Sequence, residues 1–120
     1  MDMSVGDSFE LGRNQVAALV EAQLILDPRR AQIHRDRLRR GLLPPCILEC
    51  QPSLPANPPG SEPLWVVFQE RNAGGTTALV MYDPNRAAFG IAVWQEGHAR
   101  CVGRWGGFFS MLEWLASGSR

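Results

Sequence analysis

The chain contains no lysine, and all 12 of its basic residues are arginines. This absence excludes mechanisms that need a lysine amine, such as Schiff-base catalysis or the phosphate contact of a P-loop. The sequence also lacks a G-x-S-x-G elbow, an H-E-x-x-H motif and a G-x-x-x-x-G-K-[ST] loop. With only His34 and His98 as histidines, we predict no catalytic residue and expect a protein that is not an enzyme.

Metal ligands and targeting signals are also scarce. The three cysteines are Cys46, Cys50 and Cys101, an odd number that does not suit a disulfide scaffold. Their spacing, C-x3-C and H-x2-C, does not suit structural zinc, so we predict reduced thiols, no metal and no cofactor. No apolar run approaches the roughly 18 residues that span a bilayer. The N-terminus has no apolar signal core. A cytoplasmic location without a membrane partner is expected.

The length of 120 residues predicts one domain, residues 1–120, with residues 1–12 as a loose arm. A helix is predicted from Arg13, because apolar residues recur at helical spacing. Asp27 is expected to cap a second helix that has Pro28 at its first position and ends near Gly41.

The next part of the chain changes composition and then period. Residues 42–63 hold seven of the nine prolines and predict a connector within the domain, with a short strand at Cys46–Cys50. Four strand-like runs follow, separated by NAGG, DPNR and QEGH, which are typical of tight turns. Such short connections predict an antiparallel meander. With the final run FFSMLEWLAS as a helix, the fold class is α+β: an N-terminal helical pair, a four- to five-stranded antiparallel meander and a C-terminal helix.

The predicted sheet carries more apolar surface than one layer of helices needs. Gly90, Ala92 and Trp94 share one face, and their small members predict that this face packs on the helices. The opposite face holds Phe89 and Ile91, framed by the arginines of the last strand. Three arrangements would cover it: helices on both faces, a homodimer, or another protein.

Residues 29–40, RRAQIHRDRLRR, contain half of all arginines and one acid, Asp36. Helical spacing places Arg30, His34 and Arg37 on one strip. Arginine binds carboxylate and phosphate in a two-pronged manner, which favours an acidic protein or a nucleic acid as partner. A solvated helix face that pairs with acids of its own chain is the other interpretation. Zero net charge argues against nucleic acid.

The sequence therefore predicts a small non-catalytic, cytoplasmic protein-interaction module. Its plan of short helices and a meander resembles toxin-neutralising immunity proteins, which implies an inhibitor-type role; the likeness is one of architecture, without a shared motif. The alternative is a nucleic-acid-binding regulator that uses the helix at residues 29–40. The residues predicted to contact a partner are Arg30, His34, Arg37, Arg40, Phe89, Ile91, Arg100, Arg104 and Trp114.

Overall fold

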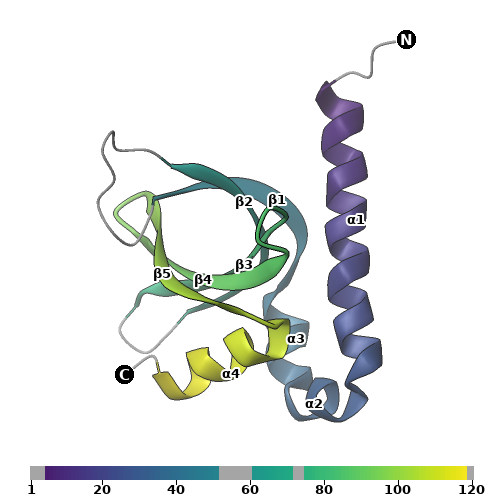
Figure 1. The fold of residues 1–120 in the computed structure, drawn as a ribbon. Helices are drawn as coiled ribbons and strands as arrows, with labels where there is room; N and C mark the ends of the chain where they lie inside the picture. Colours follow the sequence, from purple (N-terminus) through teal and green to yellow (C-terminus); the bar gives the residue numbers. More distant parts are fainter. Residues whose placement is uncertain (1–4, 52–60, 72–74, 119–120) are drawn as a thin grey trace.

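The computed structural model describes residues 5–51, 61–71 and 75–118. Helices flank a five-stranded barrel, as Figure 1 shows. The elements are α1 (Val5–Leu26), α2 (Pro28–Ile33), α3 (Arg35–Gly41), β1 (Leu42–Gln51), β2 (Glu62–Arg71), β3 (Thr77–Asp83), β4 (Ala88–Gln95), β5 (His98–Gly106) and α4 (Phe108–Gly118). The predicted α+β fold class, with N-terminal helices, an antiparallel meander and a C-terminal helix, is confirmed.

The first helix is longer than its sequence pattern indicates. It begins at Val5, so the prediction of a loose arm is wrong for residues 5–12, and residues 1–4 lie outside the described residues. A glycine inside a helix costs only about 1 kcal/mol relative to alanine. Gly12 also packs closely on the barrel, because a Cβ there would lie 2.9 Å from Cζ2 of Trp65. The helix α1 therefore continues through Gly12, where it packs closely on Trp65 of β2.

The second predicted helix is capped as expected but is broken in two. The Asp27 carboxylate accepts a hydrogen bond from the backbone N–H of Arg30 at 3.2 Å, with Pro28 next to it at the helix start. The backbone then leaves the helical region at His34, which separates α2 from α3. Gly41 ends α3 and allows close contact with β2, since a Cβ there would lie 2.5 Å from the carbonyl oxygen of Gln69.

The predicted connector at residues 42–63 is wrong at both ends. Residues 42–51 form the whole of β1, and β2 begins at Glu62, while residues 52–60 lie outside the described residues. Prolines are tolerated in a strand where ladder hydrogen bonds are interrupted. Pro44 and Pro45 lie in such a place, because the β1–β2 register shifts between Leu42 and Cys46.

The sheet closes on itself, which the sequence pattern did not predict. Neighbouring strands pair antiparallel from β1 to β5, and β1 then pairs parallel with β5 through Cys50–Ala99 and Gln51–Arg100. One face of the meander thereby becomes the interior of a barrel. The residues that fill this interior are Cys50, Leu64, Val66, Leu79, Met81, Ala92, Ala99 and Cys101.

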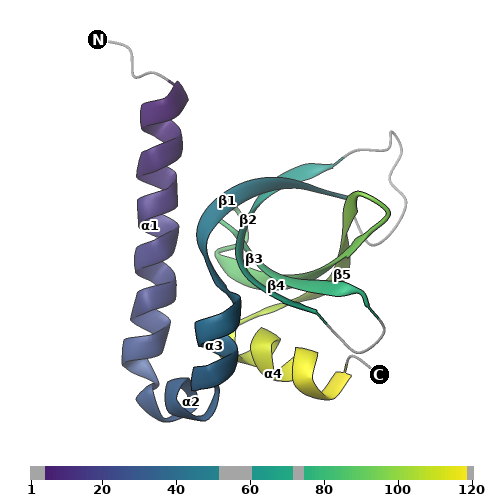
Figure 2. The same ribbon diagram turned by 180° about the vertical axis from the view of Figure 1, so that it is seen from behind.

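The predicted assignment of the two sheet faces is reversed in the structure. The face with Ala92 and Cys101 is the barrel interior, where the narrow space requires small side chains. The face with Phe89 and Ile91 is the outer one, and it is buried beneath the helices. Figure 2 shows the two helical sides clearly: α1 stands beside β1 and β2, and α4 lies against the side formed by β3, β4 and β5.

Two irregularities explain why the strands do not alternate cleanly. The β2–β3 register shifts between Val66 and Phe68, so Val67 and Phe68 both join the helix-facing core. A second shift lies in β5 around Gly103, which has a φ of 86°. Five consecutive residues of β2 are buried because both faces of the strand are covered: Leu64 and Val66 lie in the barrel interior, and Trp65, Val67 and Phe68 lie in the core beneath the helices.

Candidate functional site

Most of the predicted arginine strip contacts its own chain. Arg37 donates hydrogen bonds from Nε to Oε2 of Glu70 at 2.7 Å and from Nη2 to Oε1 at 2.9 Å. Its Nη2 also donates to the carbonyl oxygen of Leu112 at 3.0 Å. Arg37 therefore joins α3 to β2 and α4, and this role is structural.

Arg30 and His34 meet a second acid of the chain. The Nε atom of Arg30 and the Nε2 atom of His34 each lie 3.3 Å from Oε2 of Glu113 in α4. The His34 ring also stacks on Phe109, with ring centroids 6.2 Å apart. The interpretation that the arginine helix pairs with acids of its own chain thus describes Arg30, His34 and Arg37.

The predicted sheet residues divide into a buried and an exposed group. Phe89 and Ile91 are 5% and 2% exposed, and the Phe89 ring packs edge-on against Phe108 of α4 at 5.4 Å. The chain's own helix covers both, so they form no surface for a partner. On the outer side of β5, the exposed Arg104 lies over the Trp114 ring at 5.2 Å. Arg100 is exposed as well.

Arg40 belongs to a different surface from the other arginines of the strip. A hollow of about 570 Å³ lies between α3 and the β2–β3 pair. It is lined by Arg37, Arg40, Gly41, Gln69, Glu70, Arg71 and Thr77. Glu70 neutralises Arg37, whereas Arg40 and Arg71 are exposed and, among the described residues, take part in no ion pair. This hollow is therefore basic.

The basic hollow adjoins an apolar one at the mouth of the barrel. Gln69 and Thr77 line both. The second hollow has a volume of about 370 Å³ and is lined by Leu43, Cys46, Leu48, Val66, Gln69, Thr77, Leu79 and Trp94. Val66 and Leu79 belong to the barrel interior, so they form its floor. Trp94 pairs with Ala99, an interior residue, but lies near the end of β4 and stays 39% exposed.

A third hollow, of about 260 Å³, shares Leu48 and Trp94 with the second. Its other lining residues are Glu49, Gln51, Ser61, Gly97, His98 and Ala99. The Ser61 hydroxyl donates a hydrogen bond to the Glu49 carboxylate at 2.9 Å. We call the three hollows together the end groove. It runs from a basic part, past the apolar barrel mouth, to a part with mixed polar side chains.

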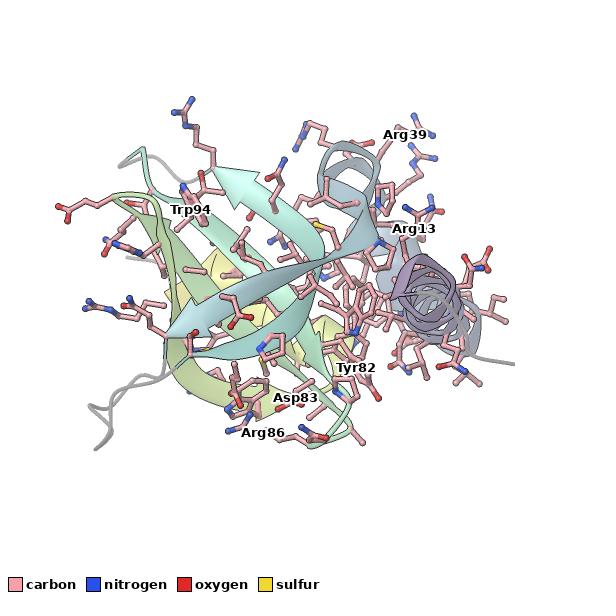
Figure 3. The ribbon with its side chains drawn as sticks, turned by 90° about the horizontal axis from the view of Figure 1, so that it is seen from above. Arg13, Arg39, Tyr82, Asp83, Arg86 and Trp94 are labelled. Carbon is pink, nitrogen blue, oxygen red and sulfur yellow. The ribbon has the colours of Figure 1, made fainter. Side chains whose placement is uncertain are left out.

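The other end of the barrel is closed. Trp105 packs against the interior cluster, and Gly90 makes room for it, since a Cβ there would lie 2.5 Å from the indole ring. Arg86 covers the ring at 4.2 Å and binds Glu62 at 2.9 Å and the buried Asp83. Hydrogen bonds to Glu62 and Asp83 raise the pKa of Arg86. Figure 3 shows Trp94 and the Asp83–Arg86 pair on opposite sides of the barrel.

The end groove holds polar side chains but no recognisable catalytic pair. The Ser61 hydroxyl donates to the Glu49 carboxylate, and within the described part of the chain the His98 side chain takes part in no hydrogen bond. In residues 5–51, 61–71 and 75–118, no three His, Cys, Asp or Glu side chains are grouped to hold a metal ion. The helices of these ranges are all too short or too polar to cross a bilayer.

Sequence reasoning identified Arg37 and Arg40 but missed the rest of the end groove. Its other principal residues, Leu48, Arg71 and Trp94, come from three different strands and meet only because the barrel closes. A tryptophan directly before a tight turn is a weak signal, and face alternation alone placed Trp94 beneath a helix. No protein-family model, curated protein or solved structure matches the chain. The function must therefore be argued from the groove itself.

Proposed function

We propose that this protein is a non-catalytic protein-binding module whose end groove binds an extended, acidic segment of a partner. The observation that carries the proposal is the shared lining of the three hollows. It places the exposed Arg40 and Arg71 beside an apolar barrel mouth with a half-exposed tryptophan at its rim.

The chemistry of each part indicates the chemistry of the ligand. Arg40 and Arg71 offer two-pronged donors to carboxylates of the partner. Leu48, Leu79 and Trp94 form an apolar seat for one aliphatic or aromatic side chain, and such anchors supply most of the affinity at interfaces. The ligand is then a short stretch of chain in which acids lie next to an apolar anchor.

The groove geometry favours a chain over a compact small molecule. Small-molecule sites enclose most of their ligand, commonly in about 300–1,000 Å³. The end groove is instead a row of three adjoining hollows across one end of the barrel. An inhibitory role toward an acidic toxin or enzyme is the finer form of the proposal, and the basic part of the groove supports it.

A displayed library of random ten-residue peptides tests the proposal directly. We expect selection on the wild-type protein to enrich peptides with Asp or Glu next to an apolar residue. Binding of these peptides should fall about tenfold or more in R40E/R71E and in W94A, because a charged or aromatic hot spot contributes 2 kcal/mol or more. R13E/R29E makes the same charge change outside the groove and should bind normally. Failure to enrich such peptides, or equal binding by all variants, refutes the proposal.

One observation favours the nucleic-acid alternative. Arg29 and Arg39, like Arg40, are exposed and take part in no ion pair among the described residues. Phosphate-driven binding weakens steeply with salt, because each neutralised phosphate releases counterions. Titrations with single-stranded RNA and duplex DNA at 50 and 200 mM salt distinguish the two functions. Tight, strongly salt-dependent binding that is lost in R29E/R39E would favour the regulator.

A further inference from the structure

Three sulfur atoms from three different strands meet inside the barrel. The Cys50 thiol of β1 lies 3.2 Å from the Met81 sulfur of β3. Cys101 of β5 comes two residues after Ala99, the β5 partner of Cys50, and belongs to the same interior cluster. All three belong to the interior cluster and are 0%, 1% and 6% exposed for Cys50, Met81 and Cys101, respectively. Two of the chain's three cysteines thus converge with a thioether in one buried place.

The donor set is uniformly soft. The remaining buried members of this hydrophobic cluster are Leu, Val and Ala, which offer no metal ligands. Thiolate and thioether ligands favour Cu(I), whereas Mg²⁺ and Ca²⁺ require oxygen. Structural zinc takes four Cys or His ligands, which this cluster does not supply. We propose that Cys50, Met81 and Cys101 form a binding site for one soft metal ion of the Cu(I) class.

A thiol has to lose its proton to become a metal ligand. At Cys50 and at Cys101 the S–H bond breaks, an S–metal bond forms and the proton is released to water. No electron is transferred.

The location gives the site a structural consequence. Two residue pairs join β1 and β5 within the described part of the chain, and this seam closes the barrel. An ion bound to Cys50 and Cys101 would cross the seam and also hold β3 through Met81. The ion would reach the cluster through local opening of the barrel at this seam.

Anaerobic titration of the full chain with Cu(I), against a chromophoric Cu(I) chelator, tests the site. We expect one ion per chain and a higher Tm in its presence, since a ligand that binds only the folded state stabilises it. Affinity should fall roughly 100-fold or more in C50S and C101S, and about tenfold in M81L, which keeps the side-chain volume. Binding by C46S should equal wild type, because Cys46 is exposed and outside the cluster.

Circular dichroism of each variant, without metal, separates loss of a ligand from loss of fold. M81L remains informative if a serine variant unfolds, because leucine fills the space of methionine without supplying a sulfur. Ag(I), which is redox-inert here, should bind with the same stoichiometry. The proposal is refuted if the wild type binds no ion, if binding survives in folded C50S and C101S, or if M81L binds as tightly as wild type.

Discussion

The Arg37 guanidinium and the Glu70 carboxylate form a two-pronged ion pair that joins α3 to β2, with N–O distances of 2.7 and 2.9 Å. Both residues line the basic part of the end groove. The pair therefore builds a wall of the groove while cancelling its own charge. The uncompensated positive charge of this part then comes from Arg40 and Arg71, which are the residues to change when binding is tested.

Replacing Arg37 with glutamine should lower the free energy of unfolding by about 1.5–3 kcal/mol, because a partly buried carboxylate loses a charged partner. Arg40→Gln should change it by no more than about 0.5 kcal/mol, since Arg40 is exposed and makes no ion pair within the described chain. Urea unfolding at pH 7 measures both. Equal stability of the two variants would show that the Arg37–Glu70 pair does not hold α3 in place.

Gly41→Ala should destabilise the fold by about 1–3 kcal/mol through overpacking. The added methyl group would lie 2.5 Å from the Gln69 carbonyl oxygen and 2.8 Å from Cζ of Phe68, a residue that is fully buried. Gly107→Ala is the matched control, because a Cβ there meets only the Ser110 hydroxyl oxygen at 3.9 Å. Thermal unfolding of both variants checks the prediction. A Gly41→Ala variant as stable as Gly107→Ala contradicts the close contact between α3 and β2.

Most elements of the fold could be predicted from local sequence signals. The cap at Asp27 and the turn after β3, where the Asp83 side chain accepts a hydrogen bond from the Asn85 N–H at 2.8 Å, depend on neighbouring residues and were predictable. The closure of the barrel was not, because Cys50 and Ala99, which form one of the pairs that close it, are distant in sequence. Because the contact between β1 and β5 was not predicted, the two sheet faces were assigned the wrong way round.

The candidate site was predictable only where it depends on one helix. Arg40 stood out because the charge run is local, but the acids that neutralise Arg30 and Arg37 come from α4 and β2. Sequence spacing cannot show such partners. The apolar seat around Trp94 requires the interior of a closed barrel, so an alternating pattern that described an open sheet could not place it.

Shortening a side chain to alanine should have different effects on the two sides of α1. Val20 is 6% exposed and packs on the barrel, so Val20→Ala should cost about 1–3 kcal/mol of unfolding free energy. Ile25 is 74% exposed, and Ile25→Ala should cost at most about 0.5 kcal/mol. Urea unfolding measures both variants. A large loss of stability in Ile25→Ala would mean that this side of α1 is covered in solution.

The homodimer considered from the sequence would have paired two open sheet faces. In the structure one face forms the barrel interior and the other packs against the helices. Ile25 and Leu26 are the most exposed large hydrophobic side chains of the described residues, so pairing of two copies is tested there. Sedimentation velocity should then show a wild-type dimer at high concentration and a monomeric I25E/L26E variant. A dimer that persists in the variant uses another surface.

Alkaline pH should destabilise the metal-free protein through Cys50. Its hydrogen bond with Cys101, and then burial, raise the pKa of Cys50 above the value of about 8.5 for an unfolded cysteine. Above pH 9 the native state therefore keeps a proton that the unfolded state has lost. The unfolding free energy should fall by about 1.4 kcal/mol per pH unit for this one proton. Cys101, whose pKa is lowered, acts in the opposite direction and only below about pH 8.5.

The absence of lysine makes this slope measurable, since no lysine ammonium group titrates in the same range. Urea unfolding between pH 8.5 and 10.5 should give a steeper loss of stability for the wild type than for a Cys50→Ala/Cys101→Ala variant. Both cysteines are replaced because, without Cys50, burial would raise the pKa of Cys101. Cys46→Ala should keep the wild-type slope, because the exposed Cys46 lies outside the sulfur cluster. Tyr82 is present in all three proteins and cancels in the comparison. Equal slopes in wild type and the double variant would show that Cys50 ionises as freely in the barrel as in the unfolded chain, which would contradict its burial beside Met81.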